Sequence, residues 1–314
     1  MPEISFVVAT KDRPAELARL WRSLNEQTRP PHEVIVVDAG TEPVPGGAMD
    51  TSRVALTYVR AARPSAARQR NEGIAACRRN AELIGFLDDD VVLEKTAVEE
   101  MGRFWIQAGH DVGGAAFNML NHPPLAWPSL KLTAFVEKAG LYARRRGAVS
   151  PAGFQTMISR IEATEYTDWL PSGASVWRRE ILDRFRFDEW FEGYSYLEDL
   201  DFSYRVGKAF RLAVVAPAGY YHLPAGTGRG SGYRFGVREV LHRVHFVRKN
   251  PELSLVRCYA ALAVRFLMNG ALSMQEASPY YLGRAFGNLV GLARALGRMA
   301  PEDGRKRAAG SVTA

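Results

Sequence analysis

The sequence has few cysteines and lacks a long uncharged hydrophobic run, and both absences narrow its class. Its two cysteines, Cys77 and Cys258, match no metal-binding or redox spacing. We therefore expect a reduced, cytoplasmic protein without a disulfide framework. The apolar segment 253–274 is interrupted by Arg257 and Arg265, and the first residues lack the cationic and apolar regions of a secretory signal. We expect neither export nor a membrane span.

Low-complexity composition is also absent. Of the 314 residues, 47% are hydrophobic and 24% charged, with 28 glycines and 17 prolines, which is normal for a globular protein. This composition excludes a disordered, collagen-like or coiled-coil chain. The length fits one large α/β domain, or a domain of about 200–250 residues with an appendage.

Acidic residues are scarce in the last third of the chain. Residues 201–314 hold 17 Lys and Arg against 6 Asp and Glu, whereas residues 1–200 hold 24 against 28. Such asymmetry indicates an anionic partner or a solvated basic face. Zinc-finger spacing and RNA-binding aromatic motifs are missing, so we expect no nucleic-acid partner. From about residue 233, arginines alternate with Val, Leu and Phe, which predicts helices with basic faces that bind an anionic membrane or cap the rest of the protein.

Short β-branched runs alternate with helical segments over the first 90 residues. Strands are expected at 4–9, 34–38, 54–59 and 84–88, and helices at 14–27 and 65–80. This order predicts parallel βαβ units with helices on both faces of the sheet. Ligands of such sheets bind beyond the carboxyl ends of the strands. Polar side chains collect at those ends.

The run Asp88-Asp89-Asp90 ends the fourth predicted strand. Strand alternation places Asp88 and Asp90 on one side and Asp89 on the other, with the outer Cα atoms about 6–7 Å apart. At an effective dielectric near 20, two carboxylates at that range repel by about 2–3 kcal/mol. A cation would relieve the repulsion, and oxygen ligands favour Mg²⁺ or Mn²⁺. The alternative is a solvated acidic turn that caps the next helix.

Two further groups carry candidate chemistry. Glu198 and Asp199 follow the aromatic loop 191–196 and precede a helical segment. One of these carboxylates could act as a general base toward a hydroxyl, although Asp199 could instead cap the helix. His222 follows a strand-like run, where it could be a metal ligand or a hydrogen-bonded structural residue.

Six segments support a resemblance to a known family. VVATKDRP, EVIVVDAG, ARQRNEGI, IGFLDDD, WLPSGASVWRREIL and YLEDLDFSYR occur in this order over about residues 3–225. In order and approximate spacing they resemble the inverting family 2 glycosyltransferases of the A-type fold. The resemblance implies an α/β protein with a mostly parallel nucleotide-binding sheet. We expect a catalytic domain at 1–230, a basic helical extension at 231–300 and a disordered tail at 301–314.

The resemblance also implies the catalytic and metal-binding residues. Asp199 matches the general base, and Glu198 matches its supporting partner. Asp90 matches the ligand of a divalent metal, and Asp88 the first carboxylate of the same motif, near the ribose and the metal. His222 matches a histidine that completes the metal shell in some members.

The remaining matched residues would bind the substrates. The nucleotide sugar would lie against Thr10, Arg13, Asp38, Arg70, Asn71, Asp88 and Asp89, and the sugar or acceptor against Gly173 and Ala174. Arg68, two residues before Arg70, leaves open which arginine faces the diphosphate.

The resemblance implies a metal-dependent transfer of one sugar, with Mn²⁺ or Mg²⁺ as cofactor. The donor would be a nucleotide-diphosphate sugar, and the acceptor a hydroxyl of a glycan or lipid-linked molecule in cell-surface polysaccharide or glycoconjugate synthesis. A Gln-x-x-Arg-Trp segment, expected in a processive synthase, is missing, as is the glycine-rich phosphate loop of a nucleotidyltransferase. The alternatives are a nucleotide-sugar-binding module on a membrane surface that transfers nothing, and a nucleotidyltransferase of related architecture. We expect a cytoplasmic protein, free or peripheral on the inner face of the membrane.

Overall fold

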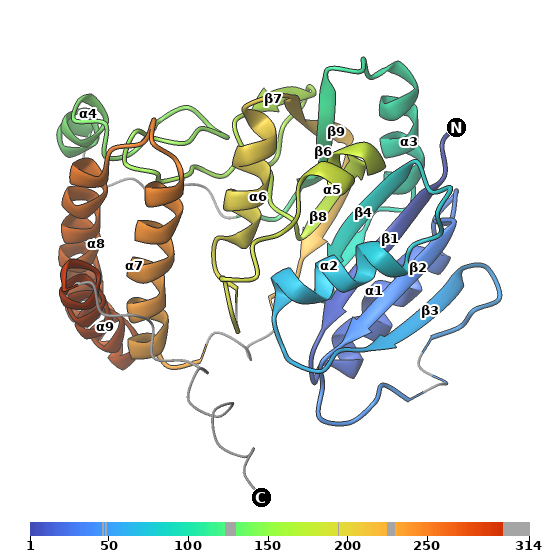
Figure 1. Ribbon diagram of the computed structural model, residues 1–314, viewed down its shortest axis with the longest axis horizontal. Coiled ribbons are helices and arrows are strands. Elements are labelled where there is room, and N and C mark those ends of the chain that lie inside the picture. Colours follow the sequence, from blue (N-terminus) through green and yellow to red (C-terminus); the bar gives the residue numbers. More distant parts are fainter. Residues whose placement is uncertain (46, 48, 123–129, 194, 225–229, 298–314) are drawn as a thin grey trace, which may run out of the picture.

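The computed structural model describes residues 1–45, 47, 49–122, 130–193, 195–224 and 230–297. The tail expected at 301–314 lies outside the described residues. Within them, the chain forms one mixed sheet flanked by helices, with a layer of long helices beside it (Figure 1).

The sheet confirms the predicted parallel arrangement of the first strands. Its strands are β1 (Ile4–Thr10), β2 (Glu33–Asp38), β3 (Ala55–Arg60), β4 (Leu83–Asp88), β5 (Val91–Leu93), β6 (Val112–Met119), β7 (Glu165–Thr167), β8 (Ala174–Arg178) and β9 (Arg211–His222). The order is β3-β2-β1-β4-β8-β6-β9-β5, and β7 pairs with β9. Strands β1 to β4 run parallel, whereas β8 is antiparallel to both of its neighbours, β4 and β6. The β8 insertion brings the start of one strand beside the end of β4.

Helices cover both faces of the sheet. The helices of the described residues are α1 (Pro14–Asn25), α2 (Ala66–Ala76), α3 (Ala97–Gln107), α4 (Leu130–Lys138), α5 (Arg179–Arg184), α6 (Glu198–Gly207), α7 (Gly232–Lys249), α8 (Leu255–Gln275) and α9 (Pro279–Leu296), of which α4, α7, α8 and α9 lie beside the sheet (Figure 1). Side chains of α1 and α3 share one core cluster with the sheet, and those of α2, α5 and α6 share the other.

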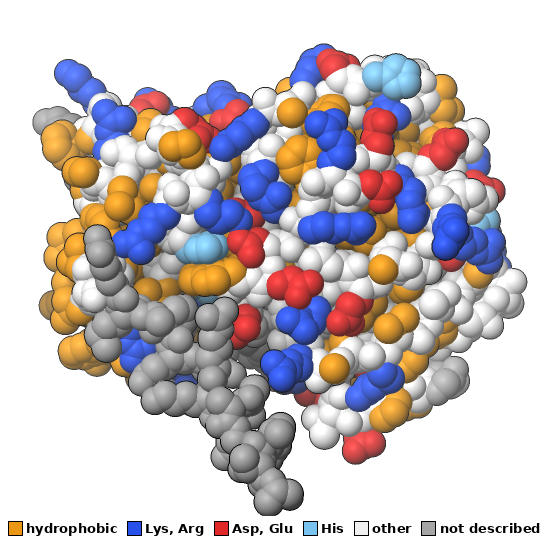
Figure 2. Space-filling view, viewed as in Figure 1, with side chains coloured by type: hydrophobic (Ala, Val, Ile, Leu, Met, Phe, Trp, Pro, Cys, Tyr) orange, Lys and Arg blue, Asp and Glu red, His pale blue; other side chains and the backbone are white. Residues whose placement is uncertain are grey.

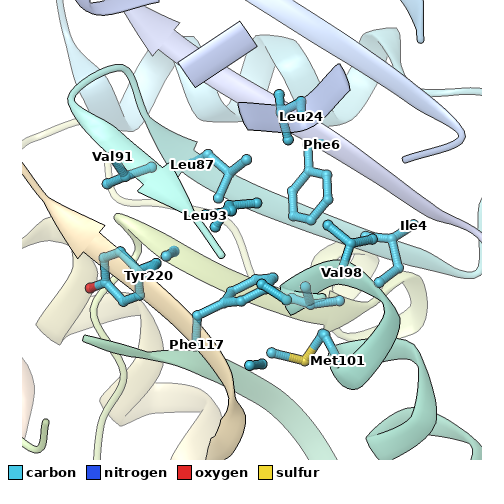
Figure 3. Packing of buried hydrophobic residues seen from close by; sticks show 14 of the residues in the cluster. Ile4, Phe6, Leu24, Leu87, Val91, Leu93, Val98, Met101, Phe117 and Tyr220 are labelled. Carbon is cyan, nitrogen blue, oxygen red and sulfur yellow. The ribbon is translucent and has the colours of Figure 1, made fainter. Parts of the chain in front are cut away.

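Strand alternation explains the two core layers. Phe6 and Val8 of β1 point into the cluster with α1 and α3, whereas Val7 between them points toward α2. Figure 3 shows Phe6 facing Phe117 of β6 in the first cluster, with ring centroids 6.2 Å apart. The near-continuous apolar strands therefore bury both of their faces, as their composition predicts.

The helical layer of α7, α8 and α9 corrects one expectation. The prediction of a basic outer face is wrong for α9, because every exposed residue of that helix is apolar. Arg284 of α9 and Arg243 of α7 instead point inward, to Glu239 and to the backbone oxygen of Gly153 respectively. Among the described residues, α8 is the one helix that is long enough and apolar enough to cross a membrane. Core helices of soluble proteins also meet these two criteria.

Glycines allow α7 and α9 to approach to backbone contact. A Cβ on Gly236 of α7 would meet the carbonyl oxygen of Arg284 at 2.2 Å, and one on Gly287 of α9 would meet that of Tyr233 at 2.2 Å. Real Cβ atoms do not approach backbone this closely, so the helix axes would have to separate.

We predict that Gly236→Ala lowers the free energy of unfolding by about 1–3 kcal/mol, because the added methyl group pushes α9 off α7. Gly270→Ala is the matched control, since a Cβ there meets nothing within 4 Å. In a helix interior that change should stabilise by about 0.4–1 kcal/mol. Chemical denaturation measures both, and equal stabilities of the two variants would contradict the packing account.

Candidate active site

The carboxyl ends of β1, β2 and β4 lie side by side and collect polar groups. Thr10 is in register with Asp38, and Ala9 with Asp88. The antiparallel strand β8 begins at Ala174, opposite Leu87, so its first residues adjoin the end of β4. The predicted convergence at one sheet edge is confirmed for these strands.

Asp89 is buried and hydrogen-bonded at this edge of the sheet. Its carboxylate accepts hydrogen bonds from the Thr10 hydroxyl at 2.7 Å and from Arg13 Nη1 at 3.0 Å. Burial raises the pKa of Asp89 to about 6, although the Thr10 and Arg13 contacts oppose that rise. Asp89 thereby fixes the loop that follows β1.

Asp90 and His222 lie together at the far side of the acidic run. The pairing of β5 with β9 sets Val91 opposite His222, and His222 Nε2 lies 3.3 Å from Asp90 Oδ1. Arg13 Nη1 lies 3.5 Å from the other Asp90 oxygen. Asp90 is 8% exposed, and the next helix begins only at Ala97. The alternative of a solvated capping turn is therefore wrong.

The predicted metal ligands are gathered only in part. Within the described ranges, no group of three or more His, Cys, Asp or Glu side chains is gathered for a metal. Of the three predicted ligands, Asp90 and His222 lie together, whereas Asp88 is paired with Arg70. Asp90 and His222 would provide one oxygen and one nitrogen ligand, a set that suits Mn²⁺ or Mg²⁺ only when further oxygen ligands come from outside the protein.

Arg70 links the two acidic segments of the site. Its Nη2 donates to Asp88 Oδ1 at 2.8 Å, and its Nη1 donates to Glu198 Oε1 at 2.5 Å. The Arg70 side chain is 4% exposed. Arg68 instead pairs with Glu189 at the surface, at 3.1 Å. Of the two arginines in this segment, Arg70 is therefore the one that contacts the carboxylates of the candidate site, Asp88 and Glu198.

The loop before α6 is strained and anchored to α2. Ser195 and Leu197 have φ angles of 36° and 73°, which non-glycine residues rarely adopt because they cost conformational free energy. The Ser195 hydroxyl donates to the Phe191 carbonyl at 2.7 Å and lies 3.3 Å from the hydroxyl of Ser65, the N-cap of α2. The loop that carries Glu198 is thus tied to the helix that carries Arg70.

Asp199 is positioned to accept a proton. Its Oδ1 accepts the Leu200 N–H at 2.7 Å, and no side chain of the described residues donates to it. Leu197 is the N-cap of α6, so Asp199 is not the capping residue, although it lies in the acidic first turn of this helix. Burial raises the pKa of Asp199, and the nearby Asp88 charge adds to the rise against the opposing Leu200 N–H and Arg70. Burial likewise raises the pKa of Glu198.

Gly173 lies directly against Asp88. The Asp88 N–H donates to the Gly173 carbonyl at 2.8 Å, and a Cβ on Gly173 would meet Asp88 Oδ2 at 2.7 Å. A side chain at this position would displace the Asp88 carboxylate. Ala174, which follows, is fully buried in β8. The structure thus brings the predicted small-residue loop to the acidic edge.

Asp38 and Asn71 are engaged within the protein. Asp38 is 1% exposed and accepts hydrogen bonds from the Tyr58 hydroxyl, Arg60 Nη1 at 2.6 Å and the Gly40 N–H at 2.7 Å. The Asn71 amide bonds the backbone of Phe187 in both directions. Their contacts with a nucleotide stay predictions.

Gln69 and Asn121 are positioning residues that the sequence did not reveal. Buried Gln69 donates to the carbonyls of Thr10 at 2.9 Å and Val37 at 2.8 Å, so it holds α2 against the ends of β1 and β2. Asn121 bonds both backbone groups of His222, at 2.7 and 2.9 Å. The one sequence signal for Gln69 was its place beside Arg70, and Asn121 gave none.

The comparison with family models agrees with this geometry. Residues 5–160 match the model described as Glycosyl transferase family 2. This part of the chain is a family 2 glycosyltransferase domain. The match covers Asp38, Asp88 and Asp90 and ends before Gly173 and Asp199.

Solved structures of glycosyltransferases share the fold. The domain and its extension are similar to residues 1–349 of S. aureus TarS in complex with UDP-GlcNAc, with 17% identity, a TM-score of 0.57, and coverage of 93% of this chain and 81% of that one. They are also similar to the mannosyltransferase PcManGT from Pyrobaculum calidifontis in complex with GDP-Man and Mn²⁺, with 16% identity, a TM-score of 0.56 and coverage of 95% and 88%. No curated protein matches the sequence. The likeness confirms the A-type glycosyltransferase fold.

We predict that Arg70→Met lowers the free energy of unfolding by about 3 kcal/mol, because it leaves Glu198 buried without its partner cation. Arg68→Met is the matched control, since its exposed pair with Glu189 is worth about 0–1 kcal/mol. Urea denaturation measures both variants. Similar losses for the two would show that Arg70 does not hold the site together.

Proposed function

We propose that the protein is an inverting glycosyltransferase that moves one sugar from a nucleotide-diphosphate sugar to a hydroxyl of a glycan or lipid-linked acceptor. The observation that supports this proposal most directly is the pair of hydrogen bonds from Arg70. They join Asp88, at the carboxyl end of β4, to Glu198, the neighbour of Asp199. The family 2 domain supports the reaction class. The ligands of the two structural neighbours, UDP-GlcNAc and GDP-Man, support a nucleotide-sugar donor without fixing its base or sugar. Cell-surface polysaccharide or glycoconjugate synthesis would use such a transfer.

Asp199 is the proposed general base. It takes the proton of the acceptor hydroxyl while that oxygen attacks the anomeric carbon, and the bond from that carbon to the diphosphate breaks with its electrons leaving on the nucleotide. One displacement inverts the anomeric configuration. The raised pKa of Asp199 suits proton acceptance. Arg70 holds the neighbouring Glu198 and keeps the start of α6 in place.

The charge balance of the site favours a divalent cation. Its five carboxylates, from Asp88 to Asp90 and at Glu198 and Asp199, face two guanidinium groups, those of Arg13 and Arg70. Asp90 and His222 would hold Mn²⁺ or Mg²⁺, with the donor diphosphate and water as the other ligands. When bound, the metal neutralises charge that develops on the leaving diphosphate.

The other strand-end residues would bind the donor. Thr10 and Arg13, fixed by Asp89, would line the nucleotide, with Asp38 and Asn71 beside them. Gly173 and Ala174 would leave room for the sugar beside Asp88. Both cysteines are free and buried, which supports the proposed cytoplasmic location.

We predict that Asp199→Asn lowers the transfer rate by about 10²–10⁴-fold and leaves donor binding unchanged, because the amide cannot accept the proton. Asp183→Asn, at an exposed carboxylate on α5, is the control. The wild-type rate should fall as the pH drops through the raised pKa of Asp199, since the base is then protonated. Donor-sugar release or transfer across a pH series measures this, and an active Asp199→Asn protein would contradict the assignment.

We predict that thermal stabilisation by one nucleoside diphosphate requires Mn²⁺ or Mg²⁺. A thermal-shift panel of UDP, GDP and dTDP, each with and without metal, measures it. Asp90→Asn and His222→Ala should abolish the metal-dependent part, because they remove the two protein ligands. Stabilisation without metal would overturn the metal assignment, and binding without any transfer would favour the alternative of a non-catalytic binding module.

A further inference from the structure

The outer surface of α9 is apolar along its whole length. Every exposed residue of this helix is apolar, and four of them are large side chains with exposed fractions of 50–67%. They recur every three or four residues and so form one stripe: Pro279, Leu282, Phe286, Leu289, Ala293 and Leu296. A helix on the surface of a water-soluble domain normally shows the reverse pattern.

Helix α8 continues this stripe. Its exposed side chains include Val256, Leu267 and Met274, with exposed fractions of 81, 66 and 87%. Only 22% of the most apolar 18-residue stretch of α8 is buried inside the protein, so α8 is not a core helix. Figure 2 shows hydrophobic side chains gathered along the edge of the molecule where Figure 1 places α8 and α9, at the left of both views.

Polar groups lie between the helices instead of outside them. Glu239 of α7 is 1% exposed and accepts two hydrogen bonds from Arg284 of α9, at 2.7 and 3.0 Å. Asn269 of α8 donates to Asn288 of α9 at 2.7 Å. Polar side chains inside, small residues at the helix contact and apolar side chains outside are the distribution found in lipid-facing helix bundles.

Positive charge lies at one end of the apolar stripe. Helices α8 and α9 are joined by a short turn, so the start of α8 lies at the same end as the last turn of α9. Arg257 is exposed in the first turn of α8, and Arg248 donates to the carbonyl of Ala295 at 3.2 Å. Arg294 lies one residue before. This end complements anionic lipid headgroups.

We propose that the α8–α9 face docks in the plane of an anionic lipid bilayer, with its apolar stripe inserted at the headgroup boundary. The proposal goes beyond the transfer reaction and does not depend on it. Insertion of apolar side chains, rather than adsorption through a basic face, dominates the contact, because the buried Arg243 and the partly buried Arg284 are already paired inside the protein. The pair of helices presents about 27–31 Å of stripe, long enough to cover many lipids.

The connections of this layer favour lying on the bilayer over crossing it. The N-cap of α8, Ser254, donates its N–H to the carbonyl of Pro151, and the Tyr142 hydroxyl donates to the Ala261 carbonyl at 3.2 Å. One side of α8 is therefore held on the glycosyltransferase body. A transmembrane α8 would have to break these contacts.

Flotation of the full chain with vesicles tests the proposal. The vesicles are phosphatidylglycerol with phosphatidylcholine, or phosphatidylcholine alone, at about 0.1 M and about 1 M NaCl, where the screening length falls from about 10 Å to 3 Å. We expect binding to the anionic vesicles that largely survives high salt. Combined Leu267→Gln, Phe286→Gln and Leu289→Gln should lower the bound fraction more than about tenfold. Ile106→Gln on α3, a side chain of similar exposure at 60%, is the matched control and should float like the wild type.

Three outcomes would overturn the proposal. The first is the absence of flotation with any vesicle. The second is binding that disappears at high salt and ignores the triple substitution, which would indicate electrostatic adsorption alone. The third is a dimer in solution that the triple substitution dissociates without any vesicle binding, which would show that a second copy covers the stripe. The far-UV circular dichroism and the ligand-free thermal unfolding midpoint check that each variant is folded, so a failed nucleotide-binding or transfer assay leaves this test unaffected.

Discussion

A buried arginine shared by two carboxylates is the constraint on which the site depends. Arg70 would be costly to bury alone, because removing a guanidinium from water is offset only by partners in good geometry. Asp88 and Glu198 supply those partners from segments that are 18 and 128 residues away along the chain. The nucleotide edge of the sheet and the loop before α6 therefore form one unit. Asp199, the proposed proton acceptor, directly follows Glu198 in this unit.

The helical layer supports the same loop from the other side. Lys249 of α7 binds Asp188 at 2.5 Å and the fully buried Asp201 of α6 at 2.8 Å. His245 stacks on Trp190 with ring centroids 3.6 Å apart. The hydrogen bonds from His245 and Lys249 hold the pKa of Asp188 well below its usual range. The extension thus packs against the loop that leads to α6, and its opposite face is the one that we propose to meet lipid.

The sequence predicted the strands and the residues at their ends better than it predicted which side chains contact one another. Runs of Val and Ile defined β1, β2 and β4 to within about one residue, because buried parallel strands need continuous apolar side chains. The insertion of β8 beside β4 was not predictable, since it depends on long-range pairing. Nor was the inward orientation of Arg284, because an arginine at helical spacing looks the same in the sequence whether its side chain meets water or Glu239. The roles of the site residues still rest on the family resemblance together with this geometry.

A double-mutant cycle on Arg70 and Glu198 tests the central claim most directly. The free energies of unfolding of Arg70→Met, Glu198→Gln and the double variant are compared with that of the wild type. The account predicts a coupling of about 2 kcal/mol or more, because the two groups share one buried contact. Additive effects, with a coupling below about 0.5 kcal/mol, would contradict it.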